Sequence, residues 1–283
     1  MKRRTLTMFI LSTAAISGCG GGTGKMPTEI SFMRDFDAAR VEATKRNEPM
    51  IIDFYTDWCK WCHVLDTVTY KDSLVIAMSK DNIFVKINAE VDTSLARQFA
   101  ISGYPTIVLT KPDGTEIDRI WGYLGPTDFY NQVQLYLQGK ETLDDYLTRL
   151  EDEPDNPEYL MTIAEKYASR SLWPKAVEFY TRVVALDMDN KRGLASKATS
   201  AIADVHGRAQ DYDAAIDDCQ EIIKRYTTSP EAENAFAMLG YYTSENGDDT
   251  GALAVYREYL QKYPEGKESN WVKSRVADLE DKL

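Results

Sequence analysis

The chain has 283 residues, enough for about two domains of ordinary size. Apolar residues make up 43% and charged residues 28%, a composition that excludes a disordered chain, a collagen-like chain and a polytopic membrane protein. The formal net charge is -12, and a surface this acidic repels phosphate, so we expect no nucleic-acid partner. Four cysteines are too few for a disulfide scaffold, and the context of each must be considered separately.

The first 18 residues have the pattern of an export signal. Three basic residues, Lys2 to Arg4, precede an apolar run over residues 6–16, which is shorter than the roughly 20 residues of a membrane span. The run ends at Ile16-Ser17-Gly18-Cys19, which resembles the lipobox of bacterial lipoproteins. The resemblance implies cleavage before Cys19 and a lipid anchor on its sulfur. The alternative is an ordinary export signal with an incidental cysteine.

Residues 19–28 form a glycine-rich stretch that we expect to be a flexible tether. It reaches at most about 30 Å, so it holds the next domain close to the membrane. The lipoprotein resemblance places the chain in the bacterial cell envelope, anchored by lipid and facing the periplasm. Because Gly20 follows Cys19 where an aspartate could stand, we expect the outer membrane in preference to the inner one.

Residues 29–140 form the first predicted domain, in which helices alternate with short β-branched runs. In chain order we expect a helix over 32–46, a strand over 50–55, a helix over 60–79, a strand over 83–88, a helix over 93–100, a hairpin of strands over 106–110 and 116–121, and a helix over 126–138. This alternation predicts an α/β fold with a central sheet covered on both faces.

Only helices are predicted beyond residues 141–157, a stretch that carries Pro154 and Pro157 and is expected to be a linker. Three later blocks share an alanine followed four residues on by an aromatic or small residue. The alanines are Ala176, Ala215 and Ala252, and helices over 158–169, 194–206 and 231–244 precede the blocks. Residues 269–283 complete the pattern as a capping helix.

This helical pattern resembles tetratricopeptide (TPR) repeats and predicts an all-α repeat domain over residues 158–283. Its three repeats meet the minimum for a stable stack. The resemblance implies a peptide or protein ligand bound along the concave face. The alternative is a helical cap that only supports the first domain.

The motif with the clearest chemistry is Trp58-Cys59-Lys60-Trp61-Cys62, which follows a predicted strand and opens a predicted helix. A thiolate, and not a thiol, attacks a disulfide. Free N–H groups and the dipole at a helix N-terminus stabilise that negative charge, and the Lys60 ammonium acts in the same direction. The spacing of three residues lets the second sulfur reach the first within one helical turn.

The surrounding residues closely resemble the thioredoxin family, and more specifically its exported thiol:disulfide interchange members. Asp53 precedes the first cysteine by six residues, Gly103-Tyr104-Pro105-Thr106 matches the cis-proline segment, and Gly122 matches the glycine after the last strand. The resemblance implies a thioredoxin fold and a protein-disulfide oxidoreductase. It makes Cys59 the exposed nucleophile, Cys62 the resolving thiol, and Asp53 the buried base for Cys62.

The substrate-binding residues follow from the same resemblance. Pro105 would present its backbone to the substrate, and Trp58, Tyr104, Lys60 and Trp61 would surround the nucleophile. We therefore expect a membrane-anchored extracytoplasmic enzyme that reduces protein disulfides with electrons from a membrane-bound donor. It would need no cofactor beyond the Cys59–Cys62 dithiol. Lys60-Trp61 replaces the Gly-Pro of cytosolic thioredoxins, so an oxidase or isomerase stays open.

Other interpretations of the cysteines also stay open. The pair could be a structural disulfide, or Cys59-x-x-Cys62-His63 could attach haem. Zinc would need about four ligands, but the one other histidine is His206 in the second half, so we expect no metal. Cys219, on an apolar-periodic helix, is expected to be buried and inert. At the level of the whole chain, the alternative function is a non-enzymatic TPR adaptor or chaperone with a redox-sensing domain.

Overall fold

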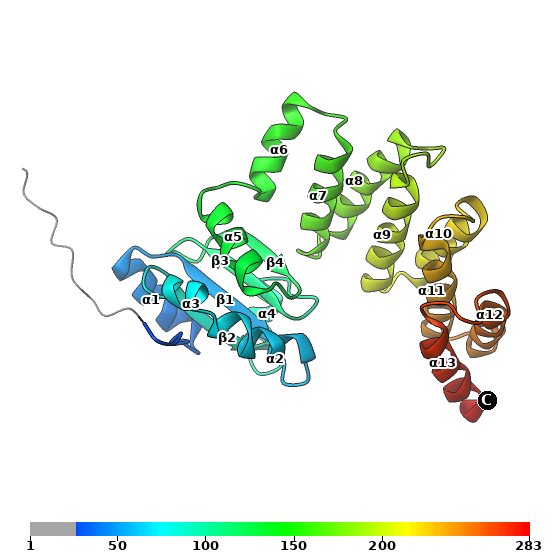
Figure 1. Ribbon diagram of the computed structural model, residues 1–283, viewed down its shortest axis with the longest axis horizontal. Coiled ribbons are helices and arrows are strands. Elements are labelled where there is room, and N and C mark those ends of the chain that lie inside the picture. Colours follow the sequence, from blue (N-terminus) through cyan, green and yellow to red (C-terminus); the bar gives the residue numbers. More distant parts are fainter. Residues whose placement is uncertain (1–26) are drawn as a thin grey trace, which may run out of the picture.

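The computed structural model describes residues 27–283, so the export signal, Cys19 and most of the tether lie outside the described residues. A sheet domain is followed by a row of helices that leads away from it and ends at the C-terminus (Figure 1). Within residues 27–283, every helix is too short or too polar to cross a membrane.

The first domain is built on a four-stranded sheet whose strands lie in the order β2-β1-β3-β4. The strands are β1 (Met50–Tyr55), β2 (Ile83–Asn88), β3 (Thr106–Thr110) and β4 (Glu116–Trp121). β1 and β2 are parallel, whereas β3 is antiparallel to both β1 and β4. All four strands have the predicted bounds, and the α/β fold is confirmed.

Helices cover both faces of this sheet, as predicted. α1 (Phe36–Arg46) and α4 (Thr93–Gln98) contribute to the core on one face, and α2 (Lys60–Thr67), α3 (Ser73–Met78) and α5 (Pro126–Leu137) contribute to the core on the other. Side chains alternate along β1, so that Ile52 joins the α1 face and Ile51 joins the α2 face. Asp53 therefore points to the same side as Ile51, toward α2.

The single helix expected over residues 60–79 is wrong, because the chain breaks there into α2, a 3-10 turn (Thr69–Lys71) and α3. The Thr69 hydroxyl donates to the carbonyl of Leu124 (2.7 Å), which draws the turn toward the loop before α5. Asp72 then starts α3 by accepting from the backbone N–H of Leu74 (2.8 Å). The first helix also starts later than predicted, because the Asp35 side chain caps it at Phe36.

The linker expected over residues 141–157 is also corrected, because helix α6 (Leu143–Asp152) occupies most of it. Leu143, Tyr146, Leu147 and Leu150 recur at helical spacing and pack in the core of the first repeat. The prolines lie beyond this helix, at its junction with the next one. The connection between the two domains is therefore short, from residue 138 to residue 142.

The second domain stacks helices in consecutive antiparallel neighbours (Figure 1). They are α7 (Pro157–Ala168), α8 (Trp173–Leu186), α9 (Leu194–Arg208), α10 (Tyr212–Arg225), α11 (Glu231–Glu245), α12 (Asp249–Lys262) and α13 (Ser269–Lys282). Ala176, Ala215 and Ala252 are fully buried, which confirms that these small residues lie where helices approach closely. Gly240 serves the same purpose, since an added Cβ would lie 2.4 Å from the ring of Tyr256.

Candidate active site

Cys59 occupies the N-cap position of α2, and its sulfur accepts a hydrogen bond from the backbone N–H of Cys62 (3.1 Å). The two sulfurs are joined in a disulfide. In this oxidised state Cys59 is only 4% exposed and Cys62 1% exposed. The expectation of an exposed Cys59 is thus corrected for the disulfide form, in which the neighbouring side chains cover most of the sulfur.

Aromatic side chains surround the disulfide. Trp58 and Trp61 are 68% and 56% exposed, far more than large apolar residues usually are. The Trp58 ring meets Tyr104 edge-to-face with centroids 5.8 Å apart, and Trp61 stacks on Tyr123 at 5.3 Å. The Trp58 indole N–H donates to Glu90 (2.9 Å), which fixes the orientation of the exposed ring.

Of these neighbours, Tyr123 and Glu90 were not predicted from the sequence. Trp58, Trp61 and Tyr104 lie around the cysteines as expected, and Lys60 is exposed at the start of α2. Glu90 lies in the turn after β2, a segment that carries no sequence motif.

The Tyr104–Pro105 peptide bond is cis, and Pro105 lies at the same end of the sheet as the disulfide. Phe54 near the end of β1 is the register partner of Thr106 at the start of β3. The residues after β1, which include Cys59, and those before β3, which include Pro105, therefore share one edge. The N–H of Gly122 donates to the Pro105 carbonyl (2.9 Å), so the two cysteines, the cis-proline segment and Gly122 meet at this edge.

Asp53 lies beneath this edge, fully buried, in register with Lys86 on β2. The Lys86 ammonium lies 3.3 Å from the Asp53 carboxylate and forms a second ion pair with Asp66 on α2. It also lies over the ring of Tyr55, with its nitrogen 4.8 Å from the centroid. Asp66 is 37% exposed, so the three charged groups lead from a buried carboxylate to the surface.

Burial raises the pKa of Asp53 from 3.8 to about 6, against the opposing pull of the nearby Lys86 charge. A carboxyl group that titrates near neutrality can accept or release a proton at physiological pH, which is what a general base requires. Its role toward Cys62 stays a prediction. Lys86 and Asp66 were missed in the sequence. The sequence did offer a signal for Lys86. It is a lysine inside the apolar run Ile83–Ile87, and the other buried strand carries an acid, Asp53, in the same way.

His63 and Cys219 were considered in the other interpretations of the cysteines, and the structure places both. The His63 ring nitrogen Nε2 bonds the backbone carbonyl of Asp57 (2.9 Å). Among residues 27–283 no group of three or more histidine, cysteine and acidic side chains is placed to hold a metal ion. Cys219 is 1% exposed, which confirms the expected burial, and burial raises the pKa of its thiol to about 12.

The raised pKa of Asp53 gives a stability prediction for Asp53→Asn. In the wild type, the folded state holds the neutral acid more strongly than the unfolded state does. Raising the pH from about 4 to about 7 ionises Asp53 and therefore lowers the free energy of unfolding by about 3 kcal/mol. The asparagine variant lacks this loss, and its stability relative to wild type should rise by about that amount over the same range. Urea unfolding at several pH values measures the difference.

The exposed Asp81→Asn provides the matched control, since this residue forms no ion pair with any of residues 27–283. Its stability relative to wild type should hardly change over this pH range. A constant difference between Asp53→Asn and wild type across the range would show that Asp53 does not titrate as described.

Comparisons with known proteins find two family models along this chain. Residues 33–134 match the family model described as Thioredoxin, and residues 200–267 match the one described as Tetratricopeptide repeat. The chain is 29% identical over 106 residues to Thioredoxin 1 of Synechococcus elongatus, which covers 35% of this chain and 96% of that protein. A solved structure described as a DsbH oxidoreductase is 16% identical, with a TM-score of 0.37, and covers 43% of this chain and 95% of that one.

A more distant relative is the Thiol:disulfide interchange protein DsbD of Campylobacter jejuni. It is 21% identical over 107 residues, which is 36% of this chain. The match spans only 19% of the length of DsbD, so it concerns one domain of that protein. Residues 33–134 thus form a thioredoxin domain with a Cys59–Cys62 disulfide, consistent with a protein-disulfide oxidoreductase, and tetratricopeptide repeats follow it.

Proposed function

We propose that the chain is a membrane-anchored, extracytoplasmic oxidoreductase that reduces disulfide bonds in proteins. The observation that carries this proposal is the position of the disulfide, with Cys59 at the N-terminus of α2 and Pro105 at the same sheet edge. Exposed Trp58 and Trp61 give this edge a surface that suits an extended polypeptide.

The proposed reaction begins with the reduced chain. The Cys59 thiolate attacks one sulfur of a substrate disulfide, that bond breaks, and the released substrate thiolate takes up a proton. The Cys62 thiol gives its proton to Asp53, and its thiolate attacks the Cys59 sulfur of the mixed disulfide. The substrate leaves with both cysteines reduced, and the Cys59–Cys62 disulfide remains. Two electrons have then passed from chain to substrate.

Lys86 and Asp66 support the proton transfer in this proposal. The charge of Lys86 stabilises the ionised form of Asp53, which opposes part of the burial effect. Because Asp66 lies at the surface and shares Lys86, a proton taken up at Asp53 has a polar path toward water. Asp53 thereby returns to its ionised state before the next cycle.

The proposed location and electron donor rest on the sequence. The lipobox-like Ile16–Cys19 segment supports an anchor in the cell envelope, facing the periplasm, with the outer membrane preferred. A membrane-bound dithiol would return the two electrons to Cys59 and Cys62. The TPR repeats would recruit a partner protein, since such stacks bind peptides along their concave face. A non-enzymatic adaptor is the alternative.

Insulin reduction by the full chain, with dithiothreitol as electron source, tests the proposed activity. We expect the wild type to accelerate the reaction and Cys59→Ser to lose at least about 100-fold of that acceleration, because no other thiol can replace the nucleophile. Cys219→Ser, a change at a buried thiol far along the chain, is the control and should keep wild-type activity.

A second variant separates the mechanism from the adaptor alternative. Cys62→Ser removes the resolving thiol and should accumulate substrate in a mixed disulfide on Cys59, visible on a non-reducing gel. Equal insulin turnover by wild type and Cys59→Ser, together with no captured substrate, would leave the adaptor as the better account.

The anchor has its own prediction. In a bacterial host that processes lipoproteins, the chain should incorporate labelled palmitate and sediment with membranes. Acyl chains on Cys19 would insert their CH₂ groups into the bilayer. Cys19→Ser should lose the label and enter the soluble fraction. Label retained in Cys19→Ser, or soluble wild type, would contradict the lipoprotein assignment.

A further inference from the structure

A cavity of about 410 Å³ lies between the two domains, within the size range of ligand sites. Strand β4 and helix α5 of the thioredoxin domain form one wall, with Arg119, Trp121 and Tyr136. Helices α7, α8 and α9 form the other, including Glu165 and Arg208. The first TPR repeats therefore turn part of their surface toward the thioredoxin domain.

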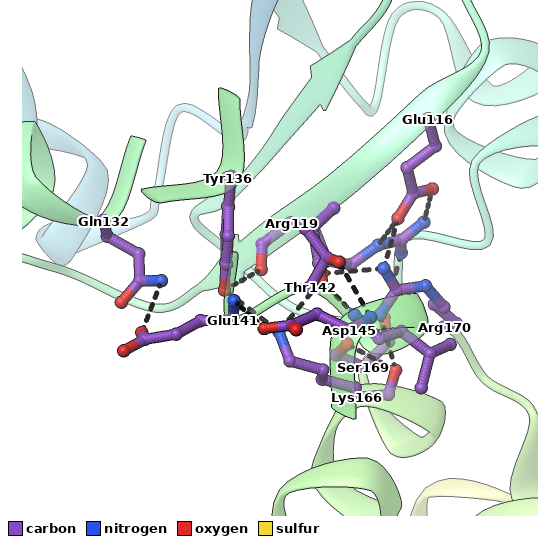
Figure 2. Close-up of polar contacts among 12 residues, drawn as sticks. Glu116, Arg119, Gln132, Tyr136, Glu141, Thr142, Asp145, Lys166, Ser169 and Arg170 are labelled. Atoms are coloured by element: carbon purple, nitrogen blue, oxygen red, sulfur yellow. Dashed lines mark hydrogen bonds and ion pairs between the residues drawn. The ribbon is translucent and has the colours of Figure 1, made fainter. Parts of the chain in front are cut away.

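Buried ion pairs join the two walls. Asp118 of β4 is fully buried and accepts from Lys166 (2.9 Å) and Arg170 (2.7 Å) of the α7 region. Arg119 donates to the carbonyl of Ser169 (2.9 Å), and Figure 2 shows Lys166, Ser169 and Arg170 meeting the β4 side chains. Because breaking a buried pair leaves an uncompensated charge, these contacts hold the walls together.

Trp121 and Arg208 place one end of the cavity near the edge of the sheet that carries the disulfide. Arg208 of α9 lies over the rings of Trp121 and Trp173, 4.8 Å from each centroid, and donates to the hydroxyl of Ser102 (2.8 Å). Ser102 precedes Pro105 by three residues, and Trp121 is the register partner of Thr106. Since two strand spacings separate β4 from β1, the cavity begins about 10 Å from the end of β1.

Three basic and three acidic side chains line the cavity, so the lining carries no net charge, but two of the acids lie outside its ion pairs. Each basic side chain in the walls already has an acidic partner: Arg119 pairs with Glu116, Lys166 with Asp118, and Arg208 with Asp204. Glu141 accepts only from the Gln132 amide (3.3 Å; Figure 2), and Glu165 forms no side-chain hydrogen bond or ion pair within residues 27–283. Glu141 and Glu165 therefore have no ion pair of 4 Å or less within residues 27–283, although the charge of Lys166 acts on both.

Aromatic rings stand beside these carboxylates, since Tyr136, Tyr146 and Tyr180 line the same cavity. A cation is attracted both by carboxylates and by the faces of aromatic rings, and a long basic side chain can place its methylene groups against the rings. An anionic side chain would meet Glu141 and Glu165 without any free basic partner in the walls. The cavity thus matches lysine or arginine.

We propose that this cavity binds a lysine or arginine side chain of the polypeptide disulfide substrate. The inference rests on the proposed reductase function and specifies its substrate class. When the reactive cysteine of an extended substrate lies at Cys59, about three to six residues of the substrate span the distance from Cys59 to the cavity, past Pro105 and Trp121. The first TPR repeats therefore act as part of the substrate-binding surface.

Peptides with one internal disulfide test the proposal on the full chain, with dithiothreitol as electron source. One series carries lysine at each position from three to six residues before or after the reactive cysteine, and matched series carry glutamine or glutamate. We expect kcat/KM to be about threefold to fivefold higher for the best lysine peptide than for its glutamine counterpart, the size of one partly screened ion pair. Glutamate should lower it further.

Variants then assign the preference to the cavity. The double variant Glu141→Gln, Glu165→Gln should lose the lysine-to-glutamine ratio, with a higher KM for the lysine peptide. Glu178→Gln, an exposed glutamate on α8 outside the cavity, should keep the wild-type ratio. High salt should reduce the ratio in wild type and leave it unchanged in the double variant.

The outcomes separate the two proposals. If wild type reduces none of the peptides beyond the rate of dithiothreitol alone, the reductase function fails. If wild type reduces all series at equal rates, or if the double variant keeps the lysine preference, the reductase stands and the cavity assignment is overturned.

Discussion

The junction between β1 and α2 is the constraint on which the rest of the site depends. The strand ends at Tyr55, and the chain reaches the N-cap of α2 four residues later with Cys59. At that position the sulfur already accepts the Cys62 N–H, one of the donors that a helix start leaves free. Strand β3 brings Pro105 to the same edge, and β2 brings Lys86 to Asp53 below it. Burying Asp53 beside Lys86 is costly for stability. It also raises the pKa of Asp53, so that this carboxyl can take up and release a proton near neutral pH.

The second domain approaches this site through side chains more than through close backbone packing. β4 is an edge strand, and the end of α7 covers its outer side. Lys166 and Arg170 make this contact through the buried Asp118. Arg208 extends the contact to the segment before Pro105. The repeats therefore contribute to the surroundings of the catalytic edge, in addition to any partner they bind further along the stack.

The sequence was sufficient for the elements whose signals are local. Three of the strands are largely apolar runs, and the fourth follows the Pro112-Asp113-Gly114 turn of a hairpin. The alanines of the repeats recur at the helix contacts, so these elements were predicted. The break after α2 was missed, since it depends on Thr69 reaching Leu124, which is 55 residues away. Helix α6 was taken for a linker because its charged residues and the following prolines outweighed its apolar stripe. The cavity between the domains could not be predicted either. It depends on the contact between Asp118 and Lys166, which are 48 residues apart, and no local sequence pattern reveals that contact.

The central claim is that Cys59, and not Cys62, is the attacking sulfur, and the order of alkylation tests it most directly. The full chain is reduced, freed of reductant, exposed briefly to iodoacetamide at neutral pH and mapped by mass spectrometry. The account predicts that Cys59 reacts at least about tenfold faster than Cys62 and Cys219. Cys59 caps the N-terminus of α2, which stabilises a thiolate, whereas Cys62 lies inside the helix and burial raises the pKa of the Cys219 thiol to about 12. Faster labelling of Cys62, or a Cys59 that reacts no faster than Cys219, would contradict it.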